Sequence, residues 1–197
     1  MILSTAYLPP IEYFQKIIQS EKILIEQHEH FIKQTYRNRC QILGPNGLQA
    51  LSIPLVNTHA KTPIHNMRIA YKENWQKIHW RGIKTAYSNS PYFLYYSDEL
   101  ATFYEVRTEF LLEYNMALLQ LMLKLLKVKR EVVFTDQYLE TSTLPDDFRT
   151  SISPKIRSAE HFKPYTQVFS DKHEFMPNLS VIDLLFNKGP EAASVLL

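Results

Sequence analysis

The sequence predicts an α/β fold: a single domain over residues 1–197 with a mixed β-sheet, an N-terminal βαβ unit, a β-hairpin and several packed helices. Three observations lead to this prediction. A strand, helix and strand pattern opens the chain, an Asn-Gly turn separates two strand-like runs, and one long helical stretch is apolar in nearly every direction. With 197 residues, 45% of them hydrophobic and 21% charged, the chain can bury a substantial core as one ordinary domain.

The expected βαβ unit has strands at residues 1–3 and 22–25, on either side of a helix that begins at Ile11 and ends near Ser20. Apolar residues recur at helical spacing from Ile11, and Pro10 suits the first turn of a helix. The short β-branched run at residues 22–25 is typical of a strand. Because a helix connects the two strands, we expect them to pair in parallel.

A β-hairpin is expected around Gly44-Pro-Asn-Gly47, with arms at residues 41–43 and 48–55. Asn-Gly supplies the positive φ angles of a tight turn, which favours antiparallel pairing of the two arms. A further short strand is expected at residues 67–71. The sheet is therefore predicted to be mixed.

Three helices are expected in the middle of the chain. Asn74 can cap the first, on which Trp75 and Ile78 share an apolar face. The second covers residues 92–104 and the third residues 108–127. Apolar side chains surround most of the axis of the third helix, which predicts that it is buried.

The C-terminal third combines regular and irregular segments. A strand is expected at residues 131–135, and the polar, proline-containing stretch at residues 141–164 is expected to be a surface loop or a lid. A last strand is expected at residues 165–169. The hydroxyl of Ser180 is well placed to cap a final helix at residues 181–187.

Charge and cysteine content exclude several classes of protein. Twenty-two Lys and Arg residues against 20 Asp and Glu leave a net charge of +2 without a long block of either sign, so binding to nucleic acid is not expected. The single Cys40 cannot form an internal disulfide and no cationic, apolar leader follows Met1, so we expect a cytoplasmic protein. The longest apolar stretch contains Glu113 and Lys124, which argues against membrane insertion.

The segment Tyr36-Arg37-Asn38-Arg39 is the first candidate binding site. It presents two guanidinium groups, an amide and a phenol within four residues, and a guanidinium group can bind a carboxylate or phosphate through two hydrogen bonds. We therefore regard these four residues as a candidate substrate-binding anion clamp. The alternative is that the arginines pair with carboxylates of the protein itself.

His79 is the candidate general base, because imidazole can exchange protons near neutral pH. It lies one helical turn after Trp75, a candidate substrate-binding residue. The alternative is an aromatic helix face with a hydrogen-bonded histidine. No serine or cysteine motif indicates a nucleophile that His79 could activate.

Glu26, His28 and His30 fall on one face of an extended segment, where they could offer oxygen and nitrogen ligands to a metal. No second cluster supplies the remaining ligands at a diagnostic spacing. The prediction is therefore that there is no metal site, although the metal alternative stays open for these three residues. The sequence identifies no cofactor.

The C-terminal helix carries the second candidate catalytic residue, Asp183, and Asn178 before the helix is a candidate substrate-binding residue. A buried ionised carboxylate needs hydrogen-bond donors, for which Arg37 and Arg39 are candidates. We therefore expect the clamp, His79 and Asp183 to converge on one concave surface.

These segments together resemble the bacterial WbqC-like family, and the resemblance covers most of the chain. The matching segments, in order, are Tyr7-Leu-Pro-Pro10, Tyr13-Phe14, Tyr36-Arg-Asn-Arg39 with Gly44-Pro-Asn-Gly47, Trp75 through His79 to Tyr87, Pro91-Tyr-Phe93, and Pro177-Asn-Leu-Ser180 through Gly189. Two departures stand out: Leu3-Ser-Thr-Ala6 replaces the family's usual His-Gln-Pro opening, and residues 141–164 form a shorter stretch than in longer members.

The resemblance implies a cytoplasmic enzyme of bacterial surface-polysaccharide (O-antigen type) biosynthesis, a transferase that attaches an acyl or glycyl group to a nucleotide-linked amino sugar. The partner would then be a small-molecule substrate, such as a sugar nucleotide. The alternative is a non-catalytic binding or scaffold protein of the same pathway. The sequence leaves open whether the protein is an enzyme, and it does not identify the acyl donor, the acceptor sugar or the oligomeric state.

Overall fold

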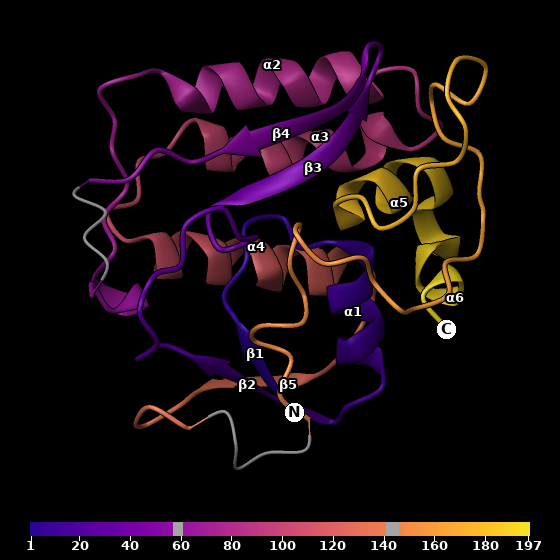
Figure 1. Ribbon diagram of the computed structural model, residues 1–197. Coiled ribbons are helices and arrows are strands. Elements are labelled where there is room, and N and C mark those ends of the chain that lie inside the picture. Colours follow the sequence, from indigo (N-terminus) through magenta and orange to yellow (C-terminus); the bar gives the residue numbers. More distant parts are fainter. Residues whose placement is uncertain (57–60, 141–145) are drawn as a thin grey trace.

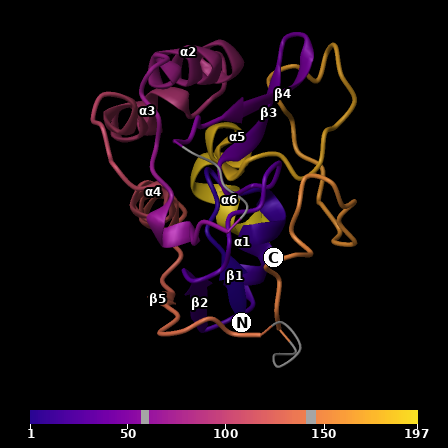
Figure 2. The ribbon, with the colours of Figure 1, turned by 60° about the vertical axis from the view of Figure 1, so that its left-hand side comes forward.

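The computed structural model describes residues 1–56, 61–140 and 146–197, and it confirms the α/β fold class. In Figure 1 a small parallel sheet lies at the bottom, a β-hairpin and a helix lie at the top, and one long helix runs between them. Figure 2 shows the same layers after a turn of 60°. Parallel and antiparallel pairing both occur, in two separate sheets.

The parallel sheet contains β1 (Ile2–Ser4), β2 (Lys22–Glu26) and β5 (Glu131–Phe134), in the spatial order β1-β2-β5. Helix α1 (Ile11–Ile18) connects β1 to β2, and these strands pair in parallel, so the predicted βαβ unit is confirmed. Asp147 extends the sheet through a parallel bridge to the outer edge of β1. All three strands therefore end at one edge, opposite the edge where they begin.

The hairpin consists of β3 (Arg39–Gly44) and β4 (Gly47–Ser52), which pair in antiparallel register with Gly44 opposite Gly47. The prediction that Asn46 and Gly47 both supply positive φ angles is wrong for Asn46. Gly47 alone in this turn has a positive φ, at +101°. The ring of Pro45 fixes a negative φ at the first turn position, and one left-handed glycine then closes the hairpin.

The three central helices form where they were expected: α2 (Trp75–Tyr87), α3 (Phe93–Ala101) and α4 (Leu111–Leu125). Short 3₁₀ turns cover Ile64–Asn66 and, directly after α3, Thr102–Tyr104. The strand predicted at residues 67–71 is wrong, because this segment makes only isolated bridges. It pairs with Leu55 on one side and with Phe110 on the other, each through a single bridge, so no continuous ladder of hydrogen bonds forms.

Two details of α2 differ from expectation. The side chain of Asn74 makes no capping hydrogen bond, and Ile78 is 57% exposed although it was placed on the buried face. The helix instead buries Trp75, His79 and Ile83, which recur every four residues along one side. Ile78 precedes His79 by one residue and therefore points about 100° away from this side.

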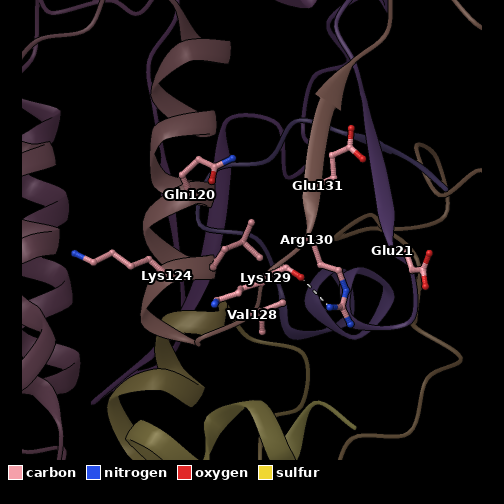
Figure 3. Close-up of a pocket in the computed structure, with 8 residues that line it drawn as sticks. Glu21, Gln120, Lys124, Val128, Lys129, Arg130 and Glu131 are labelled. Carbon is pink, nitrogen blue, oxygen red and sulfur yellow. Dashed lines mark hydrogen bonds between the residues drawn. The ribbon is translucent and has the colours of Figure 1, made fainter.

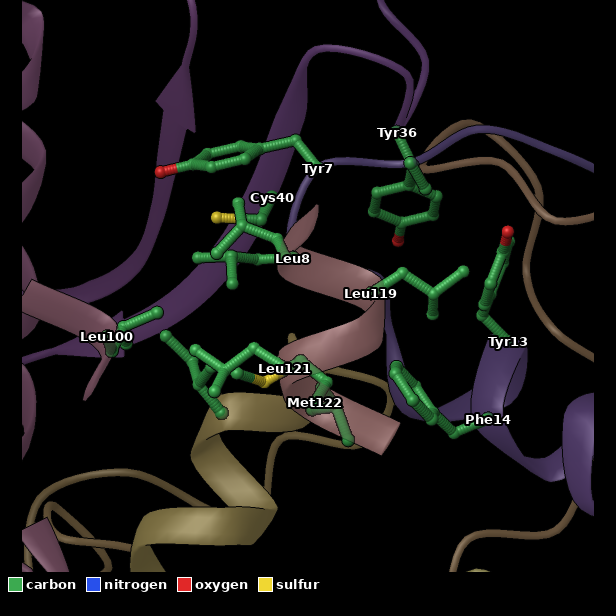
Figure 4. Close-up of a cluster of buried hydrophobic side chains, with 14 of the residues drawn as sticks. Tyr7, Leu8, Tyr13, Phe14, Tyr36, Cys40, Leu100, Leu119, Leu121 and Met122 are labelled. Atoms are coloured by element: carbon green, nitrogen blue, oxygen red, sulfur yellow. The ribbon is translucent and has the colours of Figure 1, made fainter. Parts of the chain in front are cut away.

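Helix α4 is the central core helix, as predicted, and its exposed positions form one narrow stripe at Glu113, Ala117, Gln120 and Lys124. Figure 4 shows Leu119, Leu121 and Met122 of this helix among buried side chains from the N-terminal segment and β3. Cys40 of β3 belongs to the same cluster, and burial raises the pKa of its thiol, so it is unsuited to act as a nucleophile.

The chain ends in α5 (Val181–Lys188), a 3₁₀ turn at Gly189–Glu191 and α6 (Ala192–Val195). Gly189 has a φ of +53°, and a Cβ atom there would collide with the ring of Tyr92, so only glycine fits this helix end. The expected cap at Ser180 is wrong, because its buried hydroxyl has no hydrogen-bond partner in the described part of the chain.

The segment between β5 and α5 is irregular. Residues 141–145 of the predicted loop or lid lie outside the described residues, and residues 146–164 contain neither helix nor strand. The strand predicted at residues 165–169 is wrong as well. There the Gln167 amide bonds the backbone of Met176 and the carboxyl of Asp183, so side chains take the place of a strand ladder.

Candidate functional site

The candidate site lies at the edge where the strands of the parallel sheet end. Ligands of α/β proteins bind preferentially outside the carboxyl ends of parallel strands. A cavity of about 540 Å³ opens at this edge. It is lined by His28, Glu29, His30, Ile32, Tyr138, Arg149 and Thr150, and we call it the strand-end cavity.

A buried ion pair between Glu29 and Arg37 forms one side of this site. The guanidinium group of Arg37 donates from Nε to Oε1 of Glu29 at 2.9 Å and from Nη2 to Oε2 at 2.6 Å. Nη2 also donates to the hydroxyl of Ser4, at the end of β1, at 2.6 Å. Both charged side chains are more than nine-tenths buried, so the pair is screened from solvent.

A second buried cluster joins Glu26, at the end of β2, to Arg149. Nη1 of Arg149 donates to Glu26 at 3.1 Å, and its Nε and Nη2 donate to Asp147. Glu26 is fully buried and also accepts bonds from Thr135 Oγ1 and from the backbone N–H groups of His28 and Leu139. Burial alone would raise the pKa of Asp147, but the hydrogen bonds and charge of Arg149 outweigh it and lower that pKa.

Arg149, Asp147 and Glu29 were not among the predicted site residues. Arg149 and Asp147 belong to an aperiodic polar stretch, where no local pattern distinguishes a buried arginine from a solvated one. In an extended segment Glu29 points to the opposite face from His28 and His30, so the alternation of side chains separates it from these candidate ligands. The available signal for Glu29 was its position between His28 and His30, directly after the strand β2. Residues that follow a parallel strand lie at the edge of the sheet where ligands bind.

The predicted anion clamp is largely part of the protein scaffold. Arg37 pairs with Glu29, as the alternative interpretation expected. Tyr36 is buried and bonds Gln41 at 3.4 Å, and Asn38 donates to the Ile53 carbonyl at 2.8 Å. These two residues therefore brace the hairpin.

Arg39 begins β3 and is half-buried. Its Nε is buried without a hydrogen-bond partner among the residues that the structure describes. It does not line the strand-end cavity.

The two histidines after β2 differ in their surroundings, because only the ring of His28 lies against a backbone carbonyl group. Nε2 of His28 lies 3.1 Å from the carbonyl oxygen of Thr135, and the ring contacts His65 edge-on at 5.4 Å. His30 is exposed. Within residues 1–56, 61–140 and 146–197, no group of three or more His, Cys, Asp or Glu side chains is placed to hold a metal ion.

His79 lies in an aromatic part of the core. Its Nδ1 is 3.0 Å from the hydroxyl of Tyr7, which in turn lies 2.8 Å from the hydroxyl of Tyr104, and the Trp75 ring packs edge-on at 5.1 Å. Burial lowers the pKa of His79 to about 4, although a hydrogen bond from the ring to the backbone at Ser52 acts in the opposite direction. The ring is thus neutral at physiological pH and does not line the strand-end cavity.

Asp183 lies in a third network at α5. Its Oδ2 accepts hydrogen bonds from Tyr165 at 2.6 Å and Gln167 at 3.0 Å, so the expected arginine partner is wrong. Burial raises the pKa of Asp183, although these hydrogen bonds act in the opposite direction. Arg37, His79 and Asp183 therefore belong to three separate hydrogen-bond networks. Of these, only the network of Arg37 borders the strand-end cavity.

Asn178 caps α1. Its Oδ1 accepts from the backbone N–H of Glu12 at 2.9 Å, and its Nδ2 donates to the Glu12 carboxylate at 3.0 Å. The N–H of Ile11 donates to the carbonyl of Leu179. The protein itself occupies this helix end, which in many nucleotide-binding α/β domains holds a phosphate.

A second large cavity, of about 610 Å³, lies at the opposite edge, where the strands begin (Figure 3). Lys124, Lys129 and Arg130 lie around it. The guanidinium group of Arg130 donates to the carbonyls of Ile17 and Ile18 and so caps the end of α1. The cationic side chains around this second cavity are exposed or bound to the backbone. The arginines at the strand-end cavity are instead buried and paired with carboxylates, which favours the strand-end cavity as the site.

No helix within the described residues is long and apolar enough to cross a lipid bilayer.

Comparisons with known proteins link the chain to one family. A sequence profile described as the WbqC-like protein family matches residues 5–164 and 146–195. A protein of Mycobacterium tuberculosis (strain ATCC 25618 / H37Rv), named "Uncharacterized protein Rv1507c", is 25% identical over 228 aligned positions, which cover 99% of this chain and 96% of that protein. No solved structure matches the chain significantly.

Proposed function

Because this chain belongs to the WbqC-like protein family, we propose that it is a transferase of surface-polysaccharide biosynthesis that acts on a nucleotide-linked amino sugar. Its substrate binds in the strand-end cavity. The transferred group is an acyl or glycyl group: the amine nitrogen bonds to the carbonyl carbon of an activated donor such as a thioester. The carbon–sulfur bond of the donor breaks and its thiolate leaves, while the base takes a proton from the amine nitrogen and passes it to the thiolate.

The observation that carries this proposal is an open cavity above a rigid floor of paired charges. A volume of about 540 Å³ falls within the range of small-molecule sites. The floor joins segments distant in the chain, since Glu26 and Arg149 meet across the sheet edge. Groups fixed in this way can position a substrate without reorganising, which a transferase requires.

Filling the cavity tests the proposal. Thr150 is exposed at the cavity wall, so Thr150→Trp should block the cavity without disturbing the core. Thr85→Trp is the matched control, because Thr85 is equally exposed but lines a groove between α2 and the hairpin. Binding of UDP-glucosamine, measured by calorimetry, should be lost in Thr150→Trp and kept in Thr85→Trp.

The second candidate is a non-catalytic binding or scaffold protein of the same pathway. It is favoured by the structural roles of His79 and Asp183, which are enclosed in hydrogen-bond networks of the core. If no nucleotide sugar binds the wild-type protein, or if both tryptophan variants bind equally well, the transferase proposal fails and the scaffold function is preferred.

A further inference from the structure

The charges beneath the strand-end cavity do not balance. Three carboxylates, those of Glu26, Glu29 and Asp147, face the two guanidinium groups of Arg37 and Arg149. The cluster therefore carries one net negative charge, and it is largely shielded from solvent. An ionic ligand in the cavity experiences this charge with little screening.

The hydrogen bonds of the two arginines also favour a cationic ligand over an anionic one. Arg149 directs Nε and Nη2 to Asp147 and Nη1 to Glu26, and Arg37 directs Nε and Nη2 to Glu29. A phosphate group entering the cavity would have to compete with these carboxylates at short distance. A protonated amine, by contrast, adds hydrogen-bond donors beside carboxylates that can accept further bonds.

His28 lines the cavity with a ring nitrogen that can accept a proton from such an amine. Its Nε2 lies 3.1 Å from the Thr135 carbonyl oxygen, which can only accept a hydrogen bond, so Nε2 carries the ring proton. In the ring tautomer with this proton on Nε2, the lone pair lies on Nδ1. The same residue lines the cavity, and its backbone N–H is fixed by Glu26 at 2.8 Å.

We propose, on the basis of the function proposed above, that the strand-end cavity receives the amine end of the substrate, while the phosphates remain outside its mouth. The ammonium group lies beside the carboxylate of Glu29. His28 Nδ1 takes a proton from it, which converts the ammonium group into a neutral, nucleophilic amine and the imidazole into imidazolium. The cavity thus selects an amine over a hydroxyl or a phosphate at this position.

Three small sugars test the selectivity without requiring turnover: glucosamine, glucose and glucose 1-phosphate. Calorimetry on the full chain at neutral pH should show at least about tenfold tighter binding of glucosamine than of glucose, and weaker binding of glucose 1-phosphate than of either. Because the proton passes from the ligand to His28 within the complex, nitrogen NMR of the labelled histidines measures the step: Nδ1 of His28 should gain a proton when glucosamine binds, whereas the signals of His161, an exposed residue outside the cavity, should not change.

The possible failures are distinguishable. If UDP-glucosamine binds but glucosamine binds no better than glucose, or if glucose 1-phosphate binds best, the orientation proposed here is overturned while the transferase proposal survives. If UDP-glucosamine itself does not bind, both proposals fail. Nitrogen NMR of the free protein gives an independent check, because a His28 tautomer protonated on Nδ1 would rule out its role as the proton acceptor.

Discussion

The buried imidazole of His79 should make the stability of the protein depend on pH in a predictable direction. Burial lowers the pKa of this group to about 4 in the folded state, whereas an ordinary exposed histidine has a pKa near 6.5. The folded protein therefore binds fewer protons here than the unfolded chain. The contribution of the neutral His79 ring to the free energy of unfolding is fully present above about pH 6.5 and is lost as the pH falls toward 4.

The magnitude follows from the two pKa values. Because the unfolded chain binds a proton at His79 more readily than the folded protein, acidification from pH 7 lowers the free energy of unfolding by about 2 kcal/mol at pH 5 and by about 3 kcal/mol at pH 4. His79→Gln removes the titrating ring and should flatten this part of the pH dependence, although the variant also loses the contacts of the imidazole with Tyr7 and Trp75. The comparison therefore concerns the change of stability with pH, not its absolute value.

Urea unfolding followed by tryptophan fluorescence at pH 7, 6 and 5 measures this change. His161→Gln is the control, because it removes an exposed imidazole. The wild type and His161→Gln should lose stability in parallel on acidification, and His79→Gln should lose about 2 kcal/mol less. Equal losses in all three proteins would show that His79 is not desolvated and would refute the reasoning.

Three further substitutions test the packing and the charge cluster. Leu118→Ala in α4 removes a fully buried side chain and should cost about 2 to 5 kcal/mol of unfolding free energy, so an unchanged melting curve would contradict the core assignment. Arg149→Met leaves the fully buried Glu26 without its charge partner and should lower the free energy of unfolding by about 3 to 5 kcal/mol. Adding Glu26→Gln in the same chain should restore much of this loss. If the losses of the two substitutions simply add in urea unfolding, the two side chains do not interact. Thr5→Val replaces a buried hydroxyl that has no partner within the described residues, and thermal unfolding should show no loss or a gain of up to about 1 kcal/mol, whereas a clear loss would mean that the hydroxyl is bonded.

Much of the fold could be predicted because it depends on neighbouring residues. The βαβ unit, the hairpin around Gly44-Pro-Asn-Gly47 and the buried helix α4 each follow from spacing and turn chemistry within a short segment. The errors occurred where distant contacts replaced local rules. Residues 165–169 have a strand-like composition, yet Tyr165 and Gln167 direct their polar groups to Asp183 instead of forming a ladder.

The site could be predicted only in part. Arg37 was recognised as a binder of carboxylates, and the sequence alone also singled out Glu26 and His28. Which carboxylate Arg37 binds, and that Arg149 joins Glu26 across more than a hundred residues of chain, depended on the tertiary structure.

The sequence by itself therefore determined most of the elements and the family, because hydrophobic periodicity and short motifs are local properties of the chain. The tertiary structure decided which charged groups pair, which histidine is buried and which histidines line a cavity. Those outcomes depend on burial and on distances between segments far apart in sequence, and a local pattern contains neither quantity.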